Sequence, residues 1–278
     1  MNDKMKNVLL WIIAVVLTLS LVVYQRATGP TYPIKGKTEI DGEKIAYRFL
    51  RSHDTEINAP VDIILADKDI TGQLSYKRYK SYDEWTTIDM KPNDEGLVSE
   101  LPYLPAAGKM MYNVVLFKDG VSYPLNDEPV VLRYKGAVPI SVLTPHVFFM
   151  FFSLLFGVRA GMEALFRRKD TLFQAGVALF TVIIGGLILG PIVQKYAFDA
   201  YWTGWPFGTD LTDNKTAVIF LFWLIAWLRL RKQPGNKVWP VIATIVMLIV
   251  YVIPHSVLGS EIDYTKQQTE QLKTNEDK

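Results

Sequence analysis

The sequence predicts an α+β membrane protein made of an extramembrane β-sandwich and a bundle of five transmembrane helices. Two observations predict this fold class. Apolar runs lie along the chain at residues 8–24, 140–158, 172–193, 217–228 and 238–257. Between the first two runs lies a polar stretch in which hydrophobic residues recur with the period of two that is typical of β-strands.

The first run predicts an N-terminal transmembrane helix, residues 1–25, that stays attached as a signal anchor. A basic start, with Lys4 and Lys6, and an apolar middle also fit a cleaved signal peptide. However, Gln25 and Arg26 follow the run and no small-x-small cleavage site is evident, so we expect an uncleaved anchor. Cleavage would leave four spans in the same orientation.

The polar stretch predicts an extracytoplasmic domain at residues 26–138. Candidate strands with alternating faces cover residues 44–50, 61–66, 74–80, 85–90, 97–101, 110–117 and 129–134. Turn signals such as Asp41-Gly42 and Asp119-Gly120 separate them. Many short strands with such turns predict a β-sandwich, since no helix-length amphipathic run competes.

Residues 104–114, LPAAGKMMYNV, resemble the approach to the tyrosine corner of fibronectin type III and immunoglobulin-like domains. The resemblance covers one strand and the loop before it. It implies an immunoglobulin- or fibronectin-like sandwich in which the Tyr112 hydroxyl bonds back to the chain a few residues upstream. The domain's only histidine is His53 and it has no compact acid pair, so we expect adhesion or docking rather than catalysis.

The other runs predict a four-helix transmembrane domain, residues 139–259, followed by a polar extracytoplasmic tail, residues 260–278. Most runs are long enough to cross a hydrocarbon core of about 30 Å. The run at 217–228 is the shortest, but Lys215 and Arg229 can snorkel from its ends. The tail is rich in Gln, Glu and Lys, and we expect it to be disordered or weakly helical.

Lysine and arginine near the ends of the runs predict the orientation. If every run crosses the membrane, one side collects Lys4, Lys6, Arg167, Arg168, Lys169, Arg229, Arg231, Lys232 and Lys237. We expect that side to be the cytoplasm. The large domain, the loop at residues 196–215 and the C-terminus then lie outside.

Composition agrees with a membrane protein and excludes several function classes. Hydrophobic residues make up 50% of the chain and the formal net charge is only +2, so there is no basic excess for nucleic acid. The chain has no cysteine. Disulfides, thiol catalysis, thiolate zinc sites and iron–sulfur ligation are therefore excluded.

Two histidines occupy matching places near the outer leaflet. His146 follows Thr144-Pro145 early in the second span, and His255 follows Ile253-Pro254 late in the fifth. A shared site can hold a divalent metal, ligate haem from two sides or relay protons, and haem is the least favoured of these. The simpler alternative, which we favour, is two independent histidines, each bonded to a carbonyl freed by its proline.

The loop at residues 196–215 extends the hypothesis of a shared site. It is dense in aromatic residues, including Trp202 and Trp205, and Asp210 and Asp213 precede the fourth span. Interfacial aromatics and helix-capping aspartates explain each residue type. As an alternative, the loop can cover a metal site made of the two histidines and the two aspartates, a set that suits Zn, Mn or Fe. Their spacing matches no established metal motif.

Glycines indicate where helices pack closely. Gly157 and Gly161 form a G-x-x-x-G pattern in the second span, and Gly185 and Gly186 are adjacent in the third. Small residues let transmembrane helices approach one another. We therefore expect tight packing between the second and third spans, in preference to a transport hinge.

Three segments extend the comparison to the whole chain: residues 29–33 (GPTYP), residues 187–210 and residues 253–261 (IPHSVLGSE). With them the chain resembles a family of uncharacterised bacterial inner-membrane proteins over nearly its full length. The resemblance implies a multi-pass location in the bacterial inner membrane. It implies no activity, substrate or catalytic residue.

Three functions remain open. The first is a non-enzymatic membrane protein whose sandwich docks an envelope partner or a second copy. The second is a membrane metal- or haem-binding protein for redox chemistry or metal handling, with a site at His146 and His255. The third is a small transporter or channel subunit, for which five spans are few and no inverted repeat is visible.

Overall fold

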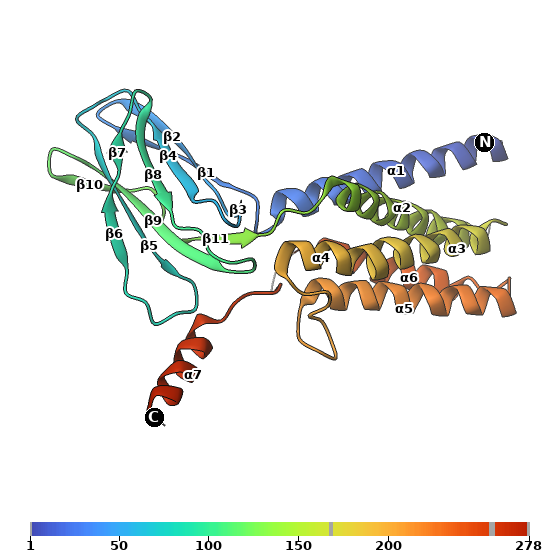
Figure 1. Ribbon diagram of the computed structural model, residues 1–278. Helices are drawn as coiled ribbons and strands as arrows, with labels where there is room; N and C mark the ends of the chain where they lie inside the picture. The colour runs from blue at the N-terminus through green and yellow to red at the C-terminus, as the bar shows by residue number, and fades with distance from the viewer. Residues whose placement is uncertain (1, 167–168, 256–258, 277–278) are drawn as a thin grey trace. The chain divides into compact units, whose positions relative to one another are not determined.

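The computed structural model describes residues 2–166, 169–255 and 259–276, and its chain divides into two compact units (Figure 1). The helical unit comprises Met1–Pro30 and Val138–Ser260. The β unit comprises Thr31–Ala137 and Glu261–Lys278. The C-terminal segment thus belongs with the β-strands rather than with the helices that precede it.

Helices in the helical unit run side by side along a common direction (Figure 1). They are α1 (Asp3–Thr28), α2 (Ile140–Leu165), α3 (Thr171–Val182), the π-helix η1 (Ile183–Leu189), α4 (Gly190–Phe198), α5 (Leu211–Lys232) and α6 (Val238–Val252). α3, η1 and α4 follow one another without a break. Within the described residues four helices are long and apolar enough to cross a membrane: α1, α2, the continuous Thr171–Phe198 segment and α5.

The fifth apolar run forms a shorter helix than the sequence predicts. α6 has 15 residues, so by helical rise it is about 22 Å long, less than a hydrocarbon core of about 30 Å. Pro254 explains the early end, because proline disfavours the helical conformation of the residue before it. Ile253 accordingly has extended angles, φ −76° and ψ 117°. Residues 256–258 of the predicted run lie outside the described residues.

Small residues allow α2 to approach α6. A Cβ atom at Gly157 would lie 2.5 Å from Met247 Sδ, and one at Gly161 would lie 2.8 Å from Thr244 Cβ. The Thr244 hydroxyl donates to the Gly157 carbonyl at 3.0 Å. The sequence analysis expected this glycine pair to face the third span, but it faces α6 instead. The spacing shows that α2 has a small face, and tertiary packing decides which helix covers it.

The other glycine pair lies in η1, between α2 and α5. A Cβ atom at Gly185 would lie 3.0 Å from the Met150 backbone nitrogen on α2. At Gly186 it would lie 2.6 Å from Thr216 Cγ2 on α5. The wide turn of a π-helix therefore occurs where the third helix is most closely packed.

A buried ion pair holds α1 against α2. Arg159 pairs with Glu163 at 2.5 Å, and their side chains are 1% and 0% exposed. The Arg159 guanidinium also donates to Asn7 Oδ1 of α1 and lies 5.2 Å from the centroid of the Trp11 ring. The spacing of four residues predicts this pair, but Arg159 is enclosed by the helices rather than reaching the surface.

Eleven strands in the described part of the β unit form two sheets. The first sheet has the order β1 (Ile34–Ile40), β2 (Glu43–Phe49), β4 (Ala59–Ile64), β8 (Gly96–Leu101) and β7 (Lys91–Pro92). The second has the order β3 (Ser52–Asp54), β11 (Val130–Lys135), β9 (Lys109–Lys118), β5 (Thr71–Arg78) and β6 (Thr86–Asp89), with β10 (Val121–Pro124) paired to β9.

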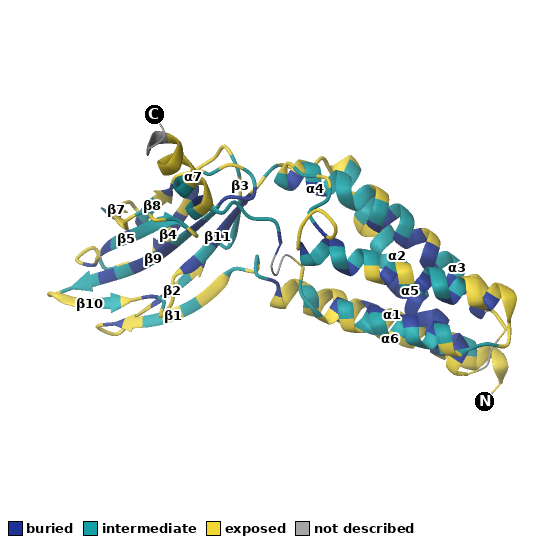
Figure 2. Ribbon diagram, turned by 90° about the horizontal axis from the view of Figure 1, so that it is seen from below, coloured by how far each residue is buried: buried dark blue, intermediate teal, exposed yellow. Residues whose placement is uncertain are grey.

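Alternate side chains of these strands point into one apolar core. Burial alternates strictly along β4 and along most of β9, as the bands of colour in Figure 2 show. Inward side chains of both sheets, such as Ile63, Leu74, Val114 and Leu116, belong to a single buried cluster. The predicted period of two is therefore confirmed as the pattern of two sheets around a common core.

Four strands of the structure are not among the seven that the sequence predicts. β3, β7 and β10 are short, and β1 is a longer strand joined to β2 by the turn at Asp41-Gly42. β1 lies at the edge of its sheet, and only Ile40 among its side chains is buried. An edge strand with one buried residue shows too little hydrophobic alternation to be recognised.

The sequence analysis expected the polar tail to be disordered or weakly helical, and the structure has a helix there. The tail forms helix α7 (Tyr264–Glu276), which belongs to the β unit. The helix is polar, and its contacts with the strands, described below, account for its order. Composition left both alternatives open, because the contacts that order the helix depend on a few side chains only.

Tyr112 is buried in the core of the β unit and forms a hydrogen bond, but to a distant part of the chain. Its hydroxyl donates to the Leu50 carbonyl at 2.9 Å, across 62 residues of sequence. The tyrosine corner implied an acceptor only a few residues upstream. The hydrogen bond instead joins β9 to the segment that links β2 and β3.

We expect Tyr112→Phe to lower the stability of the β unit by about 1 kcal/mol or more, because it leaves the partly buried Leu50 carbonyl without its donor. Urea titration of the full chain in detergent, read by pulse proteolysis of the β unit, measures the loss. Tyr103→Phe is the matched control, since Tyr103 is 57% exposed. Equal stability of the two variants would contradict the proposed role of the hydrogen bond.

Candidate functional site

One end of the helical unit contains the polar residues that the sequence analysis singled out. Asp210 caps α5, where its Oδ1 accepts from the Thr212 amide at 2.8 Å. Its Oδ2 accepts from the Ser260 amide at 2.7 Å and from the Ser260 hydroxyl at 2.8 Å. One buried carboxylate therefore joins the start of α5 to the segment that follows α6.

Asp213 has a parallel role in the loop before α5. Its Oδ2 accepts from the backbone amides of Thr203 at 2.7 Å and Gly204 at 2.9 Å. The neighbouring Asn214 Oδ1 accepts from the Trp205 amide at 2.7 Å. The first turn of α5 thus sets the conformation of the aromatic loop.

The aromatic residues of this loop point outward from that frame. Trp205 is 78% exposed and Phe207 is 83% exposed. The Trp202 indole donates to the Trp205 carbonyl at 3.1 Å, which adds to the order of the turn. Side chains this exposed in the helical unit fit interfacial aromatics better than a lid closed over a site.

Lys215 provides a cation for the end of α6. Its side chain is buried, and its Nζ donates to the Ile253 carbonyl at 2.8 Å and to the Pro254 carbonyl at 3.2 Å. Carbonyls at a helix C-terminus have no helical donor and carry partial negative charge, so an ammonium there is stabilising. The sequence analysis noted that Lys215 can snorkel from this end of the run, whereas in the structure its side chain is buried against these carbonyls.

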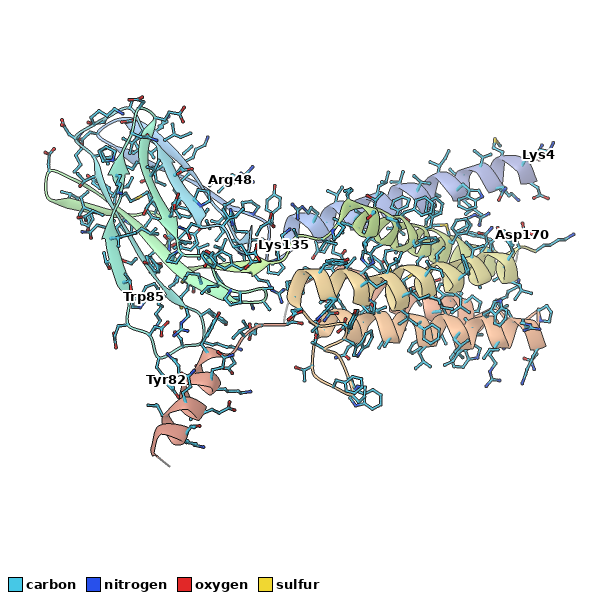
Figure 3. The ribbon with its side chains drawn as sticks, viewed as in Figure 1. Lys4, Arg48, Tyr82, Trp85, Lys135 and Asp170 are labelled. Atoms are coloured by element: carbon cyan, nitrogen blue, oxygen red, sulfur yellow. The ribbon has the colours of Figure 1, made fainter. Side chains whose placement is uncertain are left out.

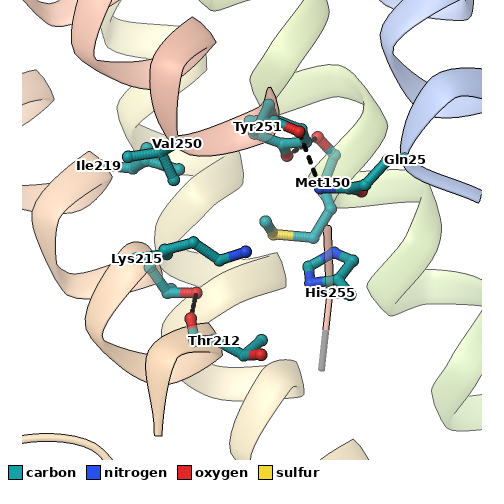
Figure 4. Close-up of a pocket in the computed structure, with 9 residues that line it drawn as sticks. Gln25, Met150, Thr212, Lys215, Ile219, Val250, Tyr251 and His255 are labelled. Carbon is teal, nitrogen blue, oxygen red and sulfur yellow. Dashed lines mark hydrogen bonds between the residues drawn. The ribbon is translucent and has the colours of Figure 1, made fainter. Parts of the chain in front are cut away.

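A small cavity of about 20 Å³ lies beside this ammonium, enough for one water molecule. Figure 4 shows Lys215 directed into it, with His255, Tyr251, Met150 and Gln25 among the lining residues. The cavity is too small for any organic substrate. It is the place where the chain around His255 meets α1, α2 and α5.

The two histidines have different surroundings. His146 donates from Nδ1 to the Gly185 carbonyl in η1 at 2.9 Å. His255 follows Pro254 and lines the cavity beside Lys215. His146 therefore does bond to a carbonyl, as the simpler alternative expects, but the carbonyl belongs to a π-turn of the neighbouring helix rather than to its own proline.

Three of the four residues of the metal hypothesis, His146, Asp210 and Asp213, form hydrogen bonds within the fold. Asp210 and Asp213 accept hydrogen bonds from Thr203, Gly204 and Ser260, and so serve the fold. Among the residues that the structure describes, no group of three or more His, Asp or Glu side chains is placed to hold a metal ion. These contacts assign the aspartates to loop and helix geometry.

A second polar region, in the β unit, was missed by the sequence analysis. It consists of cations and aromatic rings around the hairpin between β5 and β6 and is called the basic–aromatic surface here. Its members are Lys77, Arg78, Tyr79, Lys80, Tyr82, Trp85 and Lys109. Figure 3 labels Tyr82 and Trp85 on this hairpin, where they are 64% and 39% exposed. The alternation of cations with aromatic residues in YKRYKSYDEW was the available signal.

The hairpin itself organises this surface. Arg78 binds both carboxylate oxygens of Asp83, at 2.6 and 2.8 Å. This bidentate contact with Arg78 holds the pKa of Asp83 at about 2, below its ordinary value of 3.8. Lys77 donates to the Asp83 carbonyl at 3.1 Å and lies 5.6 Å from the Trp85 ring centroid. These contacts lie within the hairpin and its strands, so the surface is preformed.

The segment before and within α7 lies on this surface. Glu261 pairs with both Lys80 and Lys109. The Tyr264 ring centroid lies 4.6 Å from the Arg78 guanidinium. Gln268 accepts from the Tyr82 amide at 2.9 Å and donates to Asp83 at 3.0 Å. Residues 261–268 are called the strap below.

Comparisons of the chain with models of protein families, with curated proteins and with solved structures found no match.

We expect Lys215→Met to lower the thermal stability of the helical unit, because two carbonyls at the end of α6 lose their donor. An unsatisfied buried polar group costs about 1–3 kcal/mol. Thermal unfolding in detergent, followed by circular dichroism at a helix wavelength, measures the change. Lys232→Met is the control, since Lys232 is exposed at the other end of α5. A variant as stable as this control would contradict the role of Lys215.

Acid is expected to release the strap. Burial alone would raise the pKa values of Asp83 and Glu261, but contacts with Arg78 and with Lys109 and Lys80, respectively, lower both. Their contribution is present above the ordinary carboxylate pKa and is lost as pH falls through the folded-state values. Hydrogen exchange of α7 amides should therefore accelerate as pH falls from about 4 to about 2, after correction for intrinsic rates. Constant protection over this window would contradict the ionic docking.

Proposed function

We propose that this chain is a membrane-anchored docking protein whose β unit binds a protein partner of the cell envelope without catalysis. The basic–aromatic surface supports this proposal. It combines preformed cations with exposed Tyr82 and Trp85, and aromatic and arginine side chains are enriched where proteins bind one another. Because Arg78 and Asp83 fix the hairpin, little conformational entropy would be lost on binding.

We further propose that the chain crosses a bacterial inner membrane five times, with the β unit outside the cytoplasm. The contacts of α6 support its role as the fifth span despite its length. Lys237, which precedes α6, donates to Thr171 at the start of α3, and Tyr251 in its last turn donates to the Met150 carbonyl. α6 therefore runs along its neighbours, which supports counting it as a span.

We retain an immunoglobulin- or fibronectin-like sandwich as the proposed class of the β unit. Two mainly antiparallel sheets around one core support it. The parallel pairing of β3 with β11 and the distant acceptor of Tyr112 are differences that any such assignment must accommodate.

Topology is tested with a reporter that is active only outside the cytoplasm. Fused after Lys278 it should be active, and inserted between Arg168 and Lys169 it should be silent, because basic residues stay on the cytoplasmic side. A reporter active only in the cytoplasm provides the complementary control at both sites. A cytoplasmic C-terminus would contradict the proposal of five spans.

Docking is tested by photocrosslinking in cells. A photoreactive residue at Tyr82 should give a discrete adduct, whereas one at Ile64, which is 68% exposed on the other sheet, should not. Charge reversal of Lys80 and Lys109 to Glu should reduce the adduct at least about fivefold, since rim charges steer association. The mass of the adduct separates another protein from a second copy. Equal adducts at both positions, or none at Tyr82, would contradict docking at this surface.

A further inference from the structure

We infer that the strap is an intramolecular ligand of the basic–aromatic surface, and that the partner displaces it with an acidic helical segment of the same chemistry. The inference rests on the docking function proposed above. It adds the chemical class of the partner's segment and a means of regulation. Three contacts of the strap define what such a segment must supply.

The first contact requires a carboxylate. Glu261 bridges Lys80 and Lys109, and the side chains of these lysines are 45% and 15% exposed. Without that carboxylate the two partly buried ammonium groups would repel one another with no anion between them. A partner's segment must therefore bring an Asp or Glu to the same position.

The second contact requires an aromatic ring, and here the fit of the strap is imperfect. Tyr264 is only 5% exposed and its ring covers Arg78. Its hydroxyl is buried, and no hydrogen-bond partner for it is found among the residues that the structure describes. A buried, unsatisfied hydroxyl weakens binding. A ring without a hydroxyl, as in Phe, would fit the same place better.

The third contact requires a side-chain amide one helical turn later. Gln268 both accepts from the Tyr82 amide and donates to Asp83. Tyr264 and Gln268 are four residues apart in α7, and therefore lie on one face of the helix. The recognised pattern is an acidic residue, an aromatic residue three positions later and an amide four positions after that.

Several features indicate that the strap can leave. α7 has 13 residues and a polar composition, so an isolated helix of this sequence is marginal. The contacts of Glu261 with Lys80 and Lys109 are ionic, and such contacts weaken with salt. Arg78 and Asp83 pair directly within the hairpin, and Gln268 of the strap adds only one further donor to Asp83.

Peptide binding tests the inference directly. A fluorescent peptide of residues 259–276 is titrated into the full chain in detergent, and into a chain that ends at Ser260. We expect binding to the truncated chain and at least tenfold weaker binding to the full chain. Peptide variants Glu261→Lys and Tyr264→Ala should each bind at least tenfold more weakly, whereas Tyr264→Phe should bind more tightly. Equal binding to both chains, or to neither, would overturn the inference.

A second variant protects the test against misfolding. If the truncated chain fails to keep the circular dichroism spectrum of the full chain, a full-length Glu261→Lys, Tyr264→Ala double variant replaces it, and the same outcomes decide. The Tyr82 photocrosslink in cells then separates the two proposals. A stronger adduct in the strap-deficient chain supports both. An unchanged adduct overturns the intramolecular ligand alone, and no adduct in either chain overturns docking.

Discussion

Partners for backbone carbonyls at the end of α6 are the constraint on which this end of the helical unit depends. Pro254 ends the helix, and the carbonyls of Ile253 and Pro254 have no helical donor. Lys215 supplies the donors from α5. The same first turns of α5 carry Asp210 and Asp213, which hold Ser260 and the aromatic loop. The start of α5 therefore holds the aromatic loop, the end of α6 and the segment after it together.

The opposite half of the unit uses a different arrangement. There the charged pair Arg159–Glu163 is enclosed, and Asn7 and Trp11 bring α1 to it. Between the two ends, glycine and threonine let α2 and α6 approach. Polar contacts at both ends thus specify which helices are neighbours, while small residues set how close they lie.

The β unit separates stability from recognition. Its core is apolar and common to both sheets. The hairpin between β5 and β6 can therefore carry charged side chains without weakening that core. Asp83 engages the cations of that hairpin, and the strap adds one carboxylate, one ring and one amide. A surface organised without its ligand is suited to exchange one ligand for another, which is the physical basis of the regulation we propose.

The sequence by itself determined the two kinds of structure. Apolar runs of spanning length predicted membrane helices, because burying backbone polar groups in lipid requires helices. The period of two predicted the sheets, because one face of each strand is buried. The early end of α6 is also indicated by the sequence, because Pro254 follows its capping residue Ile253. The sequence did not reveal strand β1. This strand lies at the edge of its sheet and buries a single residue, so its hydrophobic alternation is too weak to recognise.

Only the tertiary structure decided the roles of individual polar residues. Residue type made Asp210 and Asp213 equally fit for metal binding or for capping, and the nearby amide donors assign them to capping and loop geometry. Its position at the end of an apolar run made Lys215 a candidate for snorkelling. Only the fold shows that its ammonium donates to the carbonyls of Ile253 and Pro254. Glu261 of the strap binds Lys80 and Lys109, which lie more than 150 residues earlier in the sequence. Each of these roles depends on a partner brought near by the fold, and no local pattern in the chain encodes that proximity.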